Sequence, residues 1–135
     1  MGALKGQTMV NSAHRILIID DDPDGRLMLQ TRLEANGFLV SSAANGEEGI
    51  ALAHAQHPDA ILLDVVIPKV SGLEVCRRLK KDPDTKAVPV VIITAAMFDD
   101  LEQRVRDAGA DAWVRRPCTS AQLLTVIKGA IDQAH

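Results

Sequence analysis

The chain has 135 residues, of which 47% are hydrophobic and 24% charged, and this suits one globular domain with its own core. A formal net charge of −3 and an aromatic content of 2% argue against a broad nucleic-acid or anionic-membrane surface and against aromatic stacking platforms. Two distant cysteines, Cys76 and Cys118, argue against a disulfide framework and favour a reducing, cytoplasmic setting. No apolar stretch is long enough to span a membrane.

Along the chain, a leader without periodicity precedes an alternation of strand and helix patterns. We expect residues 1–13 to be a flexible leader and residues 14–135 to form the domain. Five aliphatic runs predict strands. The three strongest are short, rich in branched residues and continuous, as in strands buried on both faces of a parallel sheet. The predicted strands lie at 16–19, 38–43, 60–63, 90–93 and 112–115, with the second and fifth the weaker ones.

The segments between and after these strands carry helix signals. Pro23 suits the start of the first helix, and Asn36-Gly37 suits its end. A fourth helix is expected at about 99–108. The fifth helix opens with a possible capping box, in which Thr119 and Gln122 would satisfy each other's free amides. Five alternations of strand and helix predict an α/β sandwich with right-handed crossovers.

Charged and polar residues follow four of the predicted strands at the point where each strand ends. Ligands of an open parallel sheet bind outside the carboxyl ends of its strands, so we expect these side chains at one edge. They are Asp20-Asp21-Asp22 after the first strand, Asp64 after the third, Thr94 after the fourth and Arg116-Pro117 after the fifth.

These residue types suit phosphoryl chemistry. Carboxylates held close together need a cation or must take up a proton, and oxygen ligands completed by water suit Mg²⁺. Thr94 and Arg116 are donors that suit an anion such as a phosphoryl group. A metal, an anion and a spare carboxylate together indicate phosphoryl transfer with the carboxylate as nucleophile.

Four of these motifs, in order and at matching spacing over about 14–133, resemble the receiver domain of two-component response regulators, the CheY-like superfamily. The motifs are Asp20-Asp21, the segment DVVIPKVSG at 64–72, Thr94-Ala95 and Arg116-Pro117. The resemblance implies a flavodoxin-like (βα)5 three-layer sandwich whose five-stranded parallel sheet has the order 2-1-3-4-5.

The resemblance also implies the central roles. Asp64 would accept a phosphoryl group from a sensor histidine kinase or a histidine phosphotransfer protein. The Mg²⁺ ligands would be Asp21 directly, Asp20 through water, Asp64, and the backbone carbonyl of Val66. Asp22 lies outside the acidic pair, and its position favours capping the first helix.

Further residues would contact the phosphoryl group or transmit its presence. The resemblance places Thr94, Ala95 and Arg116 at the phosphoryl group and Trp113 at the position of the switch aromatic. A downstream protein would bind the face formed by the helix at 99–108, the strand at 112–115 and the helix that follows it. The resemblance implies structural roles for three loop residues, with a cis bond before the last of them: Pro68, Gly72 and Pro117.

The sequence departs from the family at the site. Arg116 stands where the family normally has lysine, and Cys118 replaces an aromatic residue. Val66 and Ala96 are apolar where the family's side chains flank the hydrolytic water, so we expect slow self-hydrolysis of the phosphoaspartate, with no further enzymatic activity.

Several alternatives stay open on the sequence alone. Arg116 favours a receiver-like binding module that no longer needs phosphorylation, and Asp20-x-Asp22 imitates the paired aspartates of haloacid-dehalogenase-like phosphatases. Trp113 suits simple packing as well as switching. Cys76 is expected to be a small buried hydrophobe. His54 and His57 share a helical face, and we expect solvated histidines there because the sequence shows no third metal ligand nearby.

Overall fold

The computed structural model describes residues 13–65, 71–95 and 100–134, with only the backbone of Ser71. Within these ranges, five parallel strands form one sheet in the order β3-β2-β4-β5-β6, which confirms the predicted order. The strands are β2 (Arg15–Ile19), β3 (Leu39–Ala43), β4 (Ala60–Asp64), β5 (Val90–Thr94) and β6 (Ala112–Arg115). The predicted leader, apart from its last residue, and the predicted site residues Val66, Pro68 and Ala96 lie outside the described residues.

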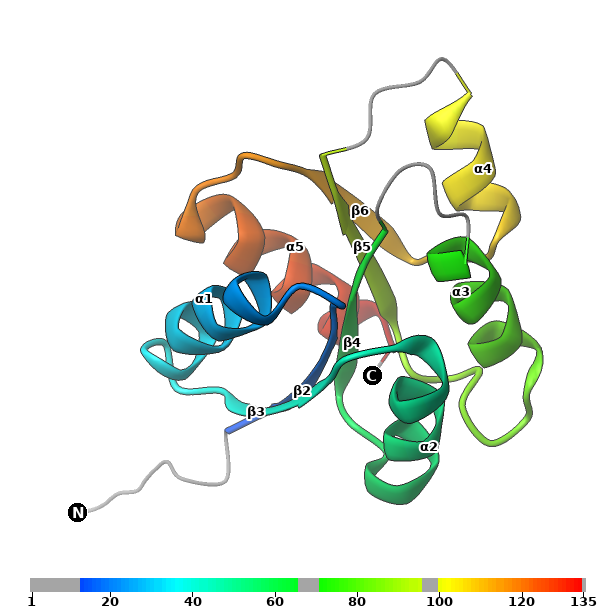
Figure 1. The fold of residues 1–135 in the computed structure, drawn as a ribbon, viewed down its shortest axis with the longest axis horizontal. Coiled ribbons are helices and arrows are strands. Elements are labelled where there is room, and N and C mark those ends of the chain that lie inside the picture. The colour runs from blue at the N-terminus through cyan, green and yellow to red at the C-terminus, as the bar shows by residue number, and fades with distance from the viewer. Residues whose placement is uncertain (1–12, 66–70, 96–99, 135) are drawn as a thin grey trace.

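Helices cover both faces of the sheet and make it the middle of three layers. In Figure 1, α1 and α5 lie on one side of the strands, and α2, α3 and α4 lie on the other. Within the described ranges, no helix combines the length and the apolar character that crossing a membrane requires. The helices are α1 (Pro23–Glu34), α2 (Gly46–Gln56), α3 (Ser71–Lys81), α4 (Leu101–Asp107) and α5 (Ser120–Ala134).

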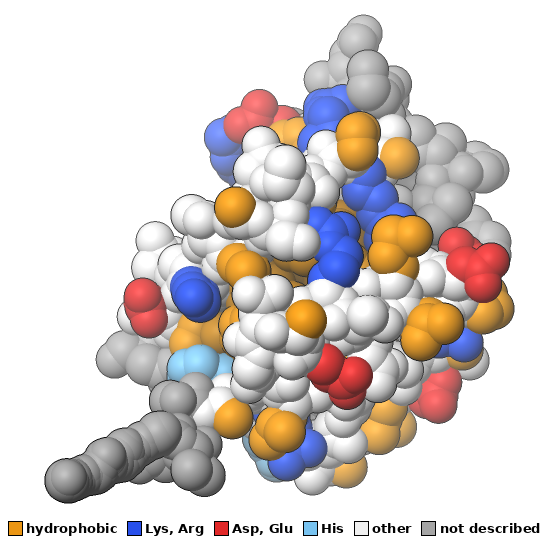
Figure 2. Space-filling model, turned by 90° about the vertical axis from the view of Figure 1, so that its left-hand side faces the viewer, with side chains coloured by type: hydrophobic (Ala, Val, Ile, Leu, Met, Phe, Trp, Pro, Cys, Tyr) orange, Lys and Arg blue, Asp and Glu red, His pale blue; other side chains and the backbone are white. Residues whose placement is uncertain are grey.

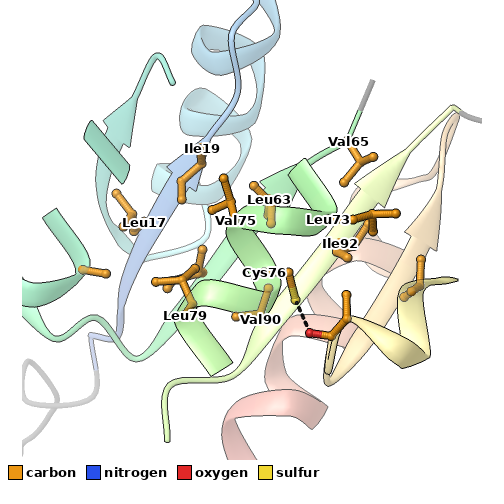
Figure 3. Close-up of a cluster of buried hydrophobic side chains, with 14 of the residues drawn as sticks. Leu17, Ile19, Leu63, Val65, Leu73, Val75, Cys76, Leu79, Val90 and Ile92 are labelled. Atoms are coloured by element: carbon orange, nitrogen blue, oxygen red, sulfur yellow. Dashed lines mark hydrogen bonds between the residues drawn. The ribbon is translucent and has the colours of Figure 1, made fainter. Parts of the chain in front are cut away.

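The continuous aliphatic runs supply two cores, because alternate residues of a strand point to opposite faces. In β2, Leu17 and Ile19 face the core under α2, α3 and α4, whereas Ile16 and Ile18 face the core under α1 and α5. Figure 3 shows the first of these cores, where the thiol of Cys76 donates to the carbonyl of Ala108 at 3.4 Å. Cys76 is therefore the buried small residue that the sequence predicted.

Two of the predicted helix N-terminal signals are present in the structure. The carboxylate of Asp22 caps α1 by accepting from the amides of Asp24 and Gly25, at 3.3 and 3.2 Å. At α5, the amide of Thr119 donates to Gln122 Oε1 at 2.8 Å, and the Gln122 amide donates to Thr119 Oγ1 at 3.0 Å. Both contacts satisfy amides that the first turn of a helix leaves free.

The strand order reverses between β2 and β4, and this reversal creates the place for a ligand. From β2 the chain passes to β3 on one side, and later returns to β4 on the other side. The helices that follow β2 and β4 therefore lie on opposite faces, which opens a crevice at the carboxyl ends of these strands. Ile19 pairs with Leu63 in the register, so Asp20 and Asp64 emerge side by side at this crevice.

Candidate functional site

Asp20 and Asp64 are the two carboxylates at the crevice. The side chain of Asp20 is fully buried, and that of Asp64 is 9% exposed. Asp20 Oδ1 accepts from the amide of Asp22 at 2.9 Å, whereas Asp20 Oδ2 is buried without a hydrogen-bond partner. A buried carboxylate oxygen without a donor is costly unless a cation or a proton meets it.

Arg116 brings its guanidinium to both carboxylates. Its Nη2 lies 3.6 Å from Asp20 Oδ2 and 3.6 Å from Asp64 Oδ2. The backbone amide of Arg116 donates to the carbonyl of Thr94 at 2.8 Å, which anchors the residue beside the end of β5. The bond between Arg116 and Pro117 is cis, as the sequence predicted.

The electrostatics of the site act most strongly on Asp64. The pKa of its carboxyl is raised to about 7: burial is the largest cause, the Arg116 guanidinium acts against it, and the neighbouring Asp20 and Asp21 add to the rise. Asp64 therefore ionises near neutral pH, and any added cation at this position favours the ionised, nucleophilic form.

Asp21 lines the same crevice without being buried in it. Together with Asp20 and Asp64 it borders a cavity of about 460 Å³. Gly72 also borders it, and a Cβ there would lie 2.9 Å from Val65 Cγ2, so glycine allows α3 to start close to the end of β4.

Thr94 and Trp113 occupy different surroundings. Thr94 is buried, and its hydroxyl donates to the carbonyl of Val65 at 2.8 Å. Trp113 is partly buried on β6 and packs against the core under α2, α3 and α4, with the guanidinium carbon of Arg115 5.4 Å from its ring centroid. The structure thus gives Trp113 a packing role and leaves its switching role a prediction.

A second cavity lies on the other side of the site, towards α1 and the start of α5. It has a volume of about 440 Å³, and Ala95, Arg116 and Pro117 border it together with Met28 and Cys118. Figure 2 shows the side of the molecule that carries α1 and α5, where basic side chains gather beside hydrophobic ones. Leu27 and Met28 of α1 are 64% and 61% exposed.

Sequence reasoning missed two features of the site. Gly25 in the first turn of α1 approaches the buried carboxylate so closely that a Cβ there would lie 2.7 Å from Asp20 Oδ2. A glycine within a predicted helix, where its low helix propensity is unfavourable, was the available signal. The pair Arg78 and Glu47 joins α3 to α2 at the rim of the first cavity, with contacts of 2.7 and 3.3 Å. No local pattern indicates a pair 31 residues apart.

The donor set fits Mg²⁺, although the carboxylates are not arranged as a cage. Among the described residues, no three carboxylate, imidazole or thiol side chains form a ready metal cluster. Mg²⁺ needs only one or two protein carboxylates and keeps several waters. The unpartnered Oδ2 of Asp20 beside Asp64 and Asp21 meets that requirement.

His54 and His57 lie at the far end of α2, away from these carboxylates, and both contact acidic residues. The ring of His54 bridges Asp82 and Asp84, at 2.9 and 2.7 Å, and His57 contacts Asp84 at 3.1 Å. The histidines are partly exposed, as expected, but their acidic neighbours come from the segment after α3, which the sequence prediction did not include.

The fold and the acidic crevice define a class of signalling domain, and comparison with known proteins identifies it. The chain belongs to the response regulator receiver domain family, whose profile matches residues 16–128. It is 34% identical to the probable transcriptional regulator ycf27 of Guillardia theta, over 93% of this chain but 48% of that protein. It is 32% identical to the polar-differentiation response regulator DivK of Brucella ovis, over 88% of this chain and 97% of that protein.

Solved structures agree with this assignment. A putative response regulator from Chloroflexus aurantiacus is 30% identical and superposes with a TM-score of 0.82, covering 90% of this chain and 99% of that one. The signal receiver domain of a signal transduction histidine kinase from Syntrophus aciditrophicus is 30% identical, with a TM-score of 0.81, covering 90% and 92%.

Proposed function

We propose that this chain is a phospho-accepting receiver in a two-component phosphorelay, with Asp64 as the acceptor. The observation that carries this proposal is the position of Asp64, beside the buried Asp20 and within 3.6 Å of the Arg116 guanidinium. Receiver domains interact with histidine kinases and with downstream effectors, so the donor would be a sensor histidine kinase or a histidine phosphotransfer protein.

The transfer itself asks for positioning and charge neutralisation. A carboxylate oxygen of Asp64 attacks phosphorus while the bond from phosphorus to the donor imidazole nitrogen breaks, and the imidazole leaves. Arg116 offsets negative charge on the phosphoryl oxygens, because its guanidinium already faces the attacking carboxylate. The chain would thus catalyse its own phosphorylation without being a turnover enzyme.

Receiver domains generally bind Mg²⁺, and we propose the same for this chain. Asp20, Asp21 and Asp64 would hold the ion, with the backbone carbonyl of Val66 as a further ligand. When bound, Mg²⁺ would neutralise charge between the acidic residues and the phosphoryl group.

Phosphorylation of Asp64 would be transmitted to the binding face for a downstream protein through Thr94. Its hydroxyl, now donating to the Val65 carbonyl, would turn to a phosphoryl oxygen, and Trp113 would respond at the face of α4, β6 and α5, where a downstream protein would bind.

The phosphorylated form would be long-lived. The apolar side chains of Val66 and Ala96 support slow hydrolysis of the phosphoaspartate, and a half-life of only seconds for the phosphorylated protein would contradict this.

The donor and the compartment are also part of the proposal. Exposed Met28 borders the cavity that reaches Arg116, and with the exposed Leu27 beside it in sequence it offers an apolar surface to a phosphodonor protein. Both cysteines are free thiols, which supports a reducing cytoplasm.

Mass spectrometry and fluorescence test the proposal together. With Mg²⁺ and a small phosphodonor, we expect Asp64 to gain the mass of one phosphoryl group, and we expect the fluorescence of Trp113 to change with beryllofluoride. Asp64→Asn should abolish both signals, whereas Asp132→Asn, the same change on the exposed part of α5, should leave both intact.

The alternatives give different results in the same experiment. Intact Mg²⁺ binding without any mass gain under saturating donor would indicate a binding module that is independent of phosphorylation. Release of many phosphates per chain from phosphoesters would indicate a phosphatase related to haloacid dehalogenases.

A further inference from the structure

The guanidinium of Arg116 meets the two acidic strand ends without forming a hydrogen bond to either. Both distances from Nη2 to the carboxylate oxygens are 3.6 Å, longer than a hydrogen bond. Arg116 Nη2 and Asp20 Oδ2 are each buried without a hydrogen-bond partner. Between Nη2 and these carboxylates the attraction is therefore one between charges, without a directional hydrogen bond.

Arg116 and a divalent cation would interact with oxygen atoms of the same carboxylates. Asp20 and Asp64 face Arg116 through the Oδ2 atoms, and these carboxylates are two of the three that would hold the ion. The guanidinium offsets one of three negative charges, so the ionised site still attracts a divalent cation. Two cations at shared ligands repel each other, and a guanidinium keeps its charge at any physiological pH.

We propose that Arg116 acts as a built-in competitor of the divalent cation and thereby sets the affinity of the site for Mg²⁺. This inference rests on the proposed function, because it concerns the cation that phosphoryl transfer to Asp64 would use. The carboxylates of Asp20 and Asp64 lie around the guanidinium of Arg116, which agrees with this competition. The side chain of Arg116 is 31% exposed and therefore has room to withdraw when the ion enters.

Titration calorimetry with MgCl₂ tests the proposal in metal-free protein at constant ionic strength. A buffer at about pH 8.5 lies above the pKa of about 7 of Asp64 in the wild type, and a repeat at about pH 9 allows for the rise of this pKa in the variants without the Arg116 charge. We expect Arg116→Gln to bind Mg²⁺ on the order of tenfold more tightly than the wild type, which is about 1.4 kcal/mol. Arg116→Met repeats the charge removal with an apolar side chain, in case the glutamine variant does not fold.

Two charge controls separate repulsion from general effects. Arg116→Lys keeps the positive charge and should keep the wild-type affinity within roughly threefold. Lys128→Gln removes one charge from the exposed surface of α5 and should leave the affinity within roughly twofold.

The possible failures are distinguishable. Neutral variants at position 116 that bind Mg²⁺ no more tightly than the wild type would overturn the competition, as would a lysine variant that binds as tightly as the neutral ones. Failure of every form, the wild type included, to bind Mg²⁺ at tens of millimolar would instead overturn the metal-dependent function on which the inference rests.

Discussion

At the scale of single residues, Asp64 makes the stability of the metal-free protein depend on pH. Its pKa rises from 3.8 to about 7 on folding, mainly through burial, so the folded chain holds a proton that the unfolded chain has already released. The stability that this group contributes is present below about pH 4, falls as the pH rises to about 7, and stays low above that.

Asp64→Asn removes this titration. We therefore expect the free energy of unfolding of the variant, relative to the wild type, to increase between about pH 4 and about pH 8 in buffer with a chelator. Urea denaturation at the two pH values measures it, and Asp132→Asn is the control, since this exposed carboxylate should give no such trend. An equal difference at both pH values would show that Asp64 ionises normally.

At the scale of elements, α2 packs closely on β2 next to the site. Gly49 of α2 lies against Ile19, the residue before Asp20, and a Cβ at Gly49 would come within 2.7 Å of Ile19 Cγ1. Ile19 is buried in the core and cannot move away freely. The contact fixes how closely α2 can approach the strand that delivers Asp20.

Gly49→Ala should therefore destabilise the protein. Overpacking costs typically about 1–3 kcal/mol, and the helix propensity of alanine returns about 1 kcal/mol, so we expect a net loss of up to about 2 kcal/mol. Gly129→Ala in α5 is the matched control: a Cβ there meets nothing within 4 Å, so this variant should gain about 0.5–1 kcal/mol. Urea unfolding measures both, and equal stabilities would refute the packing argument.

The elements and most site positions could be predicted because their signals are local. At 16–20, an aliphatic run followed by Asp20 predicts a buried strand with a carboxylate at its end. The helix cap of Asp22 is local too, because its side chain contacts amides only two and three residues further along the chain. The distance from Arg116 to the two carboxylates had no such signal, since it depends on how β6 and α5 pack beside β5. The same holds for Glu47 and Arg78, whose contact requires α2 and α3 to be neighbours.

At the scale of the whole molecule, the site joins segments that are far apart in the chain. Asp20 follows β2, Asp64 ends β4, and Arg116 follows β6, so the site exists only when the strands from β2 to β6 have paired in the sheet. An ion held by Asp20 and Asp64 therefore binds the folded chain and finds no equivalent site in the unfolded one. Such a ligand stabilises the entire fold by RT ln(1 + c/Kd), where c is the concentration of the free ion.

We accordingly expect Mg²⁺ at tenfold its dissociation constant to raise the free energy of unfolding by about 1.4 kcal/mol. Chemical denaturation with and without Mg²⁺ measures the change, with KCl at equal ionic strength as the control for screening of surface charge. The increase should appear equally in circular dichroism and in Trp113 fluorescence, because β6 carries the tryptophan and unfolds with the sheet. A shift in the fluorescence transition alone would mean that the ion stabilises only the region around β6, and that the two acidic strand ends do not share it.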